Sequence, residues 1–215
     1  MSFNWFDLIV LFGIIQGIIT CMIMICQKAV QPHKKLLIGI ILVLCVLSFK
    51  IEIHTLKLWD NASLRYFPLG IDLLIQPFLF LYVCSLTRPN FKLKTKQLIY
   101  FLLPALFFIH SLLVYLAVLP TTDLYQKDII AADWYFNQFK TIEDLLSVIS
   151  AFIYGYFCFM YINKYQHWVH QFSSDTRYHT LNWLKSLLIV SVLLAFSLFI
   201  NFLLDNTSPS DSSFY

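Results

Sequence analysis

The sequence predicts an all-α fold: a polytopic bundle of six transmembrane helices, like a seven-helix module without its last helix. Three observations lead to this prediction. Hydrophobic residues make up 59% of the 215-residue chain and charged residues only 13%, whereas soluble domains carry about 45–50% and about 25%. Long apolar segments alternate with short polar ones along the chain. Basic residues, finally, are concentrated in every second polar segment.

The stretch from residue 67 to residue 119 shows this plan most clearly. Two apolar runs, 67–86 and 98–119, flank a loop that carries four basic residues. Each run is close to the ~20 residues that cross a hydrocarbon core of ~30 Å. The pattern predicts a membrane hairpin whose turn faces the cytoplasm. Pro77 and Pro104 are expected to kink these two helices.

The whole chain divides in the same way into six apolar segments and a short tail. The expected helices cover residues 8–26, 36–54, 67–86, 98–119, 142–163 and 186–204. We therefore expect residues 1–204 to form one transmembrane domain and residues 205–215 to form a polar C-terminal tail.

The distribution of lysine and arginine predicts the orientation in the membrane. The loops after the first, third and fifth expected helices hold ten of the 15 basic residues, namely Lys28, Lys34, Lys35, Arg88, Lys92, Lys94, Lys96, Lys164, Arg177 and Lys185. Cytoplasmic loops are enriched in basic residues. The chain is thus predicted to lie in the inner membrane with its N-terminus outside, and six crossings return the C-terminus to the outside.

Ionisable and amide side chains inside the apolar segments are candidates for function, because such groups are costly at membrane depth. Lys50, Asp72, Gln76 and His110 could line an outward-facing pocket for a small ligand. Lys50 and Asp72 lie at similar depth on neighbouring helices, so an ion pair between them is geometrically reasonable. The alternative is structural: Lys50 extends to the interface and the other groups satisfy one another inside the bundle.

Motifs of soluble enzymes are absent from the sequence, which contains no HExxH, GxSxG, GxxxxGK[ST] or GxGxxG. His170 and Asp175 have the HxxxxD spacing of some acyltransferases, in which histidine acts as a general base. His167 and His170 form an HxxH pair without further ligands nearby. The five cysteines all lie in apolar segments without CxxC spacing. We therefore expect no enzymatic activity, no metal and no cofactor.

The central stretch resembles the N-terminal membrane module of AraC-type helix-turn-helix regulators common in Bacteroidetes. The matching positions are Pro77, Phe80, Tyr82, Val83, Ser85, Leu86, Lys92, Lys94, Leu98, Phe101, Leu102 and Pro104. The first hairpin and the residues before the last expected helix are also similar, so the resemblance covers most of the chain. Two departures are Gln76, where the family usually has glycine, and Tyr100, where it often has histidine.

The resemblance implies a sensory module that is coupled to transcription. In that family a further helix and a cytoplasmic DNA-binding domain follow the membrane module, and this segment itself is not expected to contact nucleic acid. Its expected partners are the lipid bilayer, a small-molecule ligand and a second copy in a homodimer. A small transporter or transporter subunit is the alternative, and a membrane acyltransferase using His170 and Asp175 is a third reading.

Overall fold

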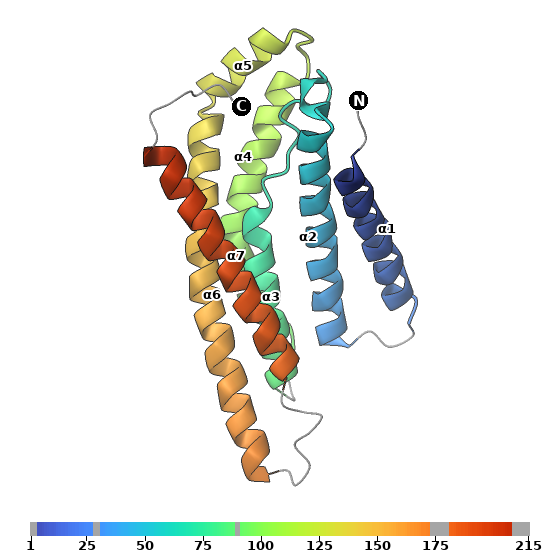
Figure 1. The fold of residues 1–215 in the computed structure, drawn as a ribbon, viewed down its shortest axis with the longest axis vertical. Coiled ribbons are helices and arrows are strands. Elements are labelled where there is room, and N and C mark those ends of the chain that lie inside the picture. The colour runs from blue at the N-terminus through green and yellow to red at the C-terminus, as the bar shows by residue number, and fades with distance from the viewer. Residues whose placement is uncertain (1–3, 28–30, 89–90, 173–180, 208–215) are drawn as a thin grey trace. The chain divides into compact units, whose positions relative to one another are not determined.

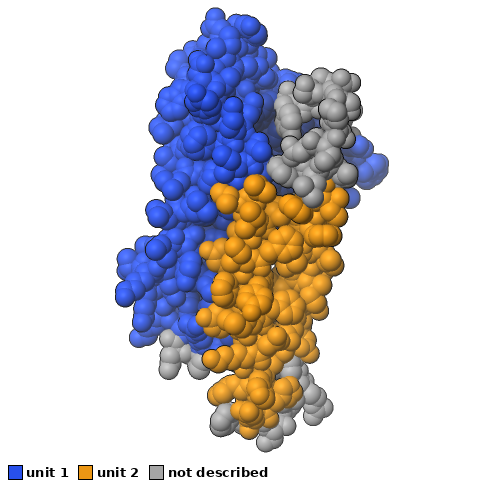
Figure 2. Space-filling view, turned by 90° about the vertical axis from the view of Figure 1, so that its left-hand side faces the viewer, with its two compact units in different colours: residues 1–144 blue, residues 145–215 orange. Residues whose placement is uncertain are grey.

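A computed structural model describes residues 4–27, 31–88, 91–172 and 181–207, and all regular secondary structure in these ranges is helical. Among the described residues, four helices are long and apolar enough to cross a membrane, and two shorter apolar helices accompany them. The chain divides into two compact units, residues 1–144 and residues 145–215, which Figure 2 shows in different colours. The boundary lies within one long helix, and each unit is described by itself below.

The first unit begins with an antiparallel pair of helices, α1 (Trp5–Ile25) and α2 (Pro32–Thr55), which lie side by side in Figure 1. A capping box between Asn4 and Asp7 starts α1, since it satisfies backbone N–H groups that have no partner within the helix. Pro32 is the first residue of α2, a position at which proline costs no hydrogen bond. The expected segment 8–26 corresponds to α1, which begins earlier, at Trp5, and ends at Ile25. The expected segment 36–54 corresponds to α2, which also begins earlier, at Pro32, and ends at Thr55.

The expected third helix, 67–86, is helical only in part. Residues 67–71 are irregular, a short 3₁₀ helix η2 (Asp72–Leu74) follows, and α3 runs from Ile75 to Thr87. Pro68 accounts for the late start, because proline donates no hydrogen bond and disfavours helical geometry in the residue before it. The irregular residues Leu69, Gly70 and Ile71 are buried in protein, as non-helical backbone at membrane depth requires.

The fourth segment combines a 3₁₀ helix, η3 (Thr95–Phe101), with an α-helix, α4 (Leu102–Val118). Pro104 is the third residue of α4, and Pro77 is likewise the third residue of α3. Neither proline has an intrahelical N–H bond to remove at this position. The two prolines thus lie in first turns of α-helices rather than at kinks in the middle of a helix.

A short helix, α5 (Leu124–Asp133), follows α4 and lies across its end in Figure 1. The sequence analysis predicted a loop in this region. Asp123 caps α5 by accepting a hydrogen bond from the backbone N–H of Tyr125. Lys127 is almost completely buried and donates to the carbonyl of Val118 at the end of α4. A cation at a helix C-terminus is favourable, so Lys127 joins the two helices.

The segment between α2 and η2, which includes a 3₁₀ helix η1 (Leu58–Asp60), is fastened to α5 by a polar contact. Arg65 donates two hydrogen bonds to the carboxylate of Asp128, at 2.8 and 2.7 Å, and Tyr66 donates a third at 2.9 Å. Burial, followed by the hydrogen bond to Asp128, raises the pKa of the Tyr66 phenol to about 12. Bidentate arginine–carboxylate pairs fix geometry, so this contact holds the segment in place.

The second unit is a helical hairpin made from the greater part of α6 (Phe136–Phe172) and α7 (Asn182–Thr207). Gly155 lies against Val192, and Gln166 hydrogen-bonds with both Asn182 and Lys185. These contacts show that the two helices are antiparallel. At about 1.5 Å per residue, the 37 residues of α6 span about 55 Å, which exceeds the ~30 Å hydrocarbon thickness.

Much of the exposed surface of the described helices is apolar. Only 6% of the most apolar 18-residue stretch of α1 is buried in protein. The exposed side chains of α1 include Trp5, Phe12 and Met22. Exposed apolar area of this extent indicates a non-aqueous surrounding or a partner. The helices therefore indicate a membrane protein, whereas the expected number of six crossings stays a prediction.

Gly39 should be a critical packing position between α2 and α3. A Cβ atom at Gly39 would lie 2.6 Å from the ring of Phe78, whereas a Cβ atom at Gly13 would meet nothing within 4 Å. We expect Gly39→Ala to lower the free energy of unfolding by about 1–3 kcal/mol, the usual cost of overpacking. Thermal unfolding in detergent micelles measures this, with Gly13→Ala as the matched control. Equal melting temperatures for the two variants would contradict the packing described here.

Candidate functional site: an ionic cluster at one end of the first unit

Five charged side chains from three segments meet at one end of the first unit. Lys50 lies in the last turns of α2, and Asp72 is the first residue of η2. Lys140, Glu143 and Asp144 lie in the first turns of α6, at the i, i+3 and i+4 spacing that places side chains on one helix face. We call these five residues the ionic cluster.

The ammonium group of Lys140 is the centre of the ionic cluster. Its Nζ atom lies 2.7 Å from Asp72 Oδ2, 2.9 Å from Glu143 Oε2 and 3.0 Å from Asp144 Oδ1. The Nζ atom of Lys50 lies 2.7 Å from the same Oδ2 atom of Asp72. One carboxylate oxygen of Asp72 is therefore shared between two lysines, and one lysine is shared among three carboxylates.

The cluster lies partly inside the protein. The side chain of Glu143 is 4% exposed, whereas those of Lys50, Asp72 and Lys140 are 22–27% exposed and that of Asp144 is 50% exposed. Glu143 Oε1 is buried without a hydrogen-bond partner among the described residues. Charge–charge interactions strengthen as the local dielectric constant falls, so the bonds of Lys140 to Asp72 and Glu143 should contribute more than surface ion pairs.

Gly70, in the irregular segment, makes room for this arrangement. A Cβ atom at Gly70 would lie 3.3 Å from Ser111 Cβ, 3.4 Å from the carbonyl oxygen of Phe107 and 3.5 Å from Glu143 Oε2. The backbone of the irregular segment thus passes between α4 and the carboxylate of Glu143. A larger side chain at position 70 would push against both.

The three carboxylates have the spacing of a metal site, and Lys140 supplies the positive charge instead. One oxygen each of Asp72, Glu143 and Asp144 lie within 4.8 Å of one another. The Lys140 ammonium bonds to all three of these residues. With two cationic and three anionic groups, the cluster has a formal charge of −1 when every member is ionised. A tethered cation thus compensates the acidic groups.

The structure brings together two of the four residues that the sequence analysis selected. Lys50 and Asp72 form the ion pair that was considered there. His110 instead stacks on Phe139, with ring centroids 3.9 Å apart, and its Nε2 atom lies 3.1 Å from the carbonyl oxygen of Trp134. Gln76 is half-buried in the first turn of α3, and no hydrogen bond joins it to the cluster within the described part of the chain.

The sequence analysis missed Lys140, Glu143 and Asp144. It placed Lys140 in a loop and began the helix at residue 142, whereas α6 begins at Phe136. The signal that could have found them is the KTIED sequence from 140 to 144, in which a lysine precedes acidic residues at helical spacing.

The pair considered for acyl transfer is described only in part. His170 is exposed near the end of α6, and Asp175 lies outside the described residues. The pairing of their side chains therefore stays a prediction.

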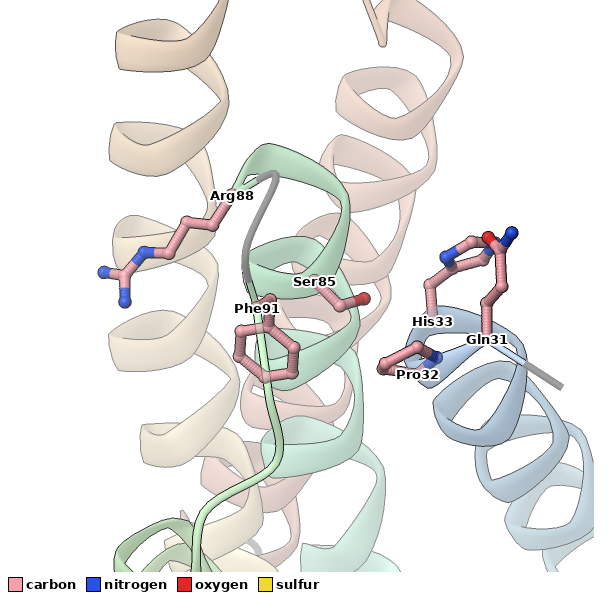
Figure 3. A pocket seen from close by; sticks show the side chains of 6 residues that line it. All are labelled: Gln31, Pro32, His33, Ser85, Arg88 and Phe91. Atoms are coloured by element: carbon pink, nitrogen blue, oxygen red, sulfur yellow. The ribbon is translucent and has the colours of Figure 1, made fainter.

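Two cavities in the first unit lie away from the ionic cluster, around the start of α2 and the end of α3. One, of about 320 Å³, is lined by Gln31, Pro32, His33, Ser85, Arg88 and Phe91. Figure 3 shows the Ser85 hydroxyl pointing toward Pro32 and His33, and the Arg88 side chain pointing away from them. The other, of about 450 Å³, is mainly apolar and includes Phe78, Leu81 and Phe101. Neither is lined by Lys50, Asp72, Gln76 or His110.

Comparison of the chain with known protein families, with curated proteins and with solved structures finds no match.

Removal of Lys140 should destabilise the protein far more than removal of Lys50. Lys140→Met leaves three neighbouring carboxylates with a single lysine, and loss of one partner from a buried ion pair costs about 3–5 kcal/mol. Lys50→Met leaves Asp72 bonded to Lys140, so a loss of at most about 1 kcal/mol is expected. Thermal unfolding in micelles compares the two variants, with Lys92→Met on the exposed loop as control. Equal losses for Lys50→Met and Lys140→Met would contradict the central position of Lys140.

Proposed function

We propose that this chain is an integral membrane sensory module of the kind found in membrane-bound AraC-type regulators, and that it detects a signal from the outer side of the inner membrane. The observation that carries the proposal is the ionic cluster, which ties together the end of α2, the start of the third apolar segment and the start of α6. Charged groups at membrane depth are costly and are retained mainly for function. All three segments meet on the side that the distribution of basic residues assigns to the outside.

Six crossings of the membrane are compatible with the observed helices. The apolar helical stretch Asp72–Thr87 is the shortest of the first unit, and its 16 residues cover about 24 Å at 1.5 Å per residue. The irregular residues 67–71 lie directly before it and add to this length. The 26 residues of α7 correspond to about 39 Å, which suffices for a crossing.

The proposed mechanism is a change between two arrangements of the helices that meet at the cluster. Asp72 and Lys140 connect segments far apart in sequence, so a ligand that takes over one of these bonds would free the start of α6 from α2 and η2. Such a ligand shifts the equilibrium only as far as it binds one arrangement more tightly than the other. The formal charge of −1 favours a ligand with a cationic group, which would replace a lysine ammonium beside the carboxylates.

A small transporter is the second candidate, and one structural observation favours it. The irregular, buried residues 67–71 precede a short helix beside charged groups, and discontinuous helices of this kind form the ion sites of many secondary transporters. A transporter would use the carboxylates of the cluster to bind a coupling cation. The sensory proposal instead requires a domain that passes the signal on, such as the cytoplasmic DNA-binding domain of the AraC-type regulators.

The mass of the native protein distinguishes the two candidates. We expect an antibody against residues 120–141 to detect, in membranes of the source cell, a protein well above the 25.3 kDa of this chain, because a sensor of this type carries a DNA-binding domain. A chain with Asp72→Asn should keep that mass, lose some stability because the ion pairs to Lys50 and Lys140 are weakened, and lose its signalling response. A native mass equal to that of this chain, together with cation uptake by proteoliposomes that Asp72→Asn abolishes, would overturn the sensory proposal.

A further inference from the structure

Gln16 places an amide group on the exposed side of α1 in the middle of the helix. It lies 11 residues after Trp5 and nine before Ile25, which at 1.5 Å per residue is about 16 Å from one end and about 14 Å from the other. Its side chain is exposed and makes no hydrogen bond with any described residue, whereas its backbone carbonyl accepts from Thr20. In a bilayer the amide would therefore lie near the midplane.

The opposite side of α1 is the one that packs on α2. A seam of buried and half-buried positions repeats every three or four residues, and contacts to α2 mark it directly. The thiol of Cys21 donates to the Ile38 carbonyl, and the thiol of Cys45 donates to the carbonyl of Ile14. At about 100° per residue, Gln16 is rotated roughly 120° from the centre of this seam. The exposed side chains of Ile9, Phe12 and Ile23 lie on the same face as Gln16.

An amide that faces hydrocarbon lacks the hydrogen bonds that water would supply, which is costly. Glutamine side chains in membrane helices therefore form hydrogen bonds across helix interfaces. A carboxamide is self-complementary, because its carbonyl oxygen accepts and its NH₂ group donates. All copies of a membrane protein share one orientation, so two α1 helices from two copies are parallel, with Gln16 at the same depth in each.

We infer that the face of α1 formed by Ile9, Phe12, Gln16 and Ile23 binds the same face of a second copy, with the two Gln16 amides paired across a two-fold axis. Such an interface is isologous, since each residue meets its own equivalent near the axis. The inference depends on membrane insertion of α1 and is independent of the sensory proposal.

The amide of an identical helix fits the Gln16 amide better than a serine hydroxyl in a helix does. Ser150, Ser186 and Ser191 all donate to carbonyl groups of their own helices. A hydroxyl that is used in this way offers the Gln16 amide no free donor. The amide of an identical helix offers a donor and an acceptor at the same depth.

The first test compares dimerisation of the full-length chain in liposomes by energy transfer between donor-labelled and acceptor-labelled copies. Gln16→Leu keeps the size of the side chain and removes the amide, so the dissociation constant should rise at least about fivefold, as expected for loss of an interhelical amide hydrogen bond. Gln16→Asn keeps the amide and should dimerise, as should the control Ile15→Leu. Energy transfer that is absent in wild type, or unchanged in Gln16→Leu, would overturn the inference.

Disulfide cross-linking tests the face itself, in a chain in which the exposed Cys26 is replaced by serine. Phe12→Cys and Ile23→Cys should each form dimers on oxidation. Ile18→Cys is the matched control: Ile18 is also exposed, but its position is rotated about 160° from Gln16. Equal cross-linking at positions 12 and 18 would overturn the inference. Cross-linking of Phe12→Cys to a different protein or within one chain would do so as well.

Discussion

The bonds of one ammonium group to three carboxylates determine how the end of the first unit is built. Lys140 contacts Asp72, Glu143 and Asp144, all within 3.0 Å, and Glu143 is almost fully removed from solvent. Three carboxylates this close would repel one another strongly where the dielectric constant is low. The start of α6 is therefore held beside η2, and α2 is held there through Lys50.

The bilayer explains features of this chain that would be unfavourable in water. A helix such as α1 packs mainly on α2 and leaves most of its apolar surface outside the protein, which lipid accommodates. Helix packing then depends on close approach at small residues rather than on removal of apolar area from water. Gly39, beneath the ring of Phe78, and Gly17, beside Cys45, are two such positions. In lipid, a polar group without a hydrogen-bond partner, such as the Gln16 amide, is costly, so such a group favours contact with a further helix.

The helical fold class and the approximate positions of the apolar helices follow from hydropathy alone, because each segment approaches the length needed to cross a bilayer. Hydropathy contains no information on backbone geometry. It therefore predicts a helix over residues 67–71, although Pro68 disfavours helical structure there. It also left α5 in a loop, because a short helix with charged residues resembles a surface segment. There Asp123 is the local signal, since aspartate is a preferred N-cap residue.

For the site, counting residues from the membrane surface identified Lys50 and Asp72, and they are paired. Depth alone does not give the direction of a side chain around its helix, and for this reason His110 was grouped with residues that it does not contact. Lys140 could not be assigned by depth, because its role arises from the start of α6 at Phe136 and from a fold that brings residue 140 to residue 72. The KTIED spacing signals the local pairs of Lys140 with Glu143 and Asp144, whereas no local pattern encodes its tertiary contact with Asp72.

The most direct test of this account is a double-mutant cycle between Asp72 and Lys140. The free energy of unfolding would be measured in one micelle system for the wild type, Asp72→Asn, Lys140→Met and the double variant. If the shared ion pair links η2 to α6, the coupling energy should be about 1–3 kcal/mol, in the range of directly interacting residues. Effects that add to within about 0.5 kcal/mol would show that the two residues act independently, and the cluster would then not be the contact that holds these segments together.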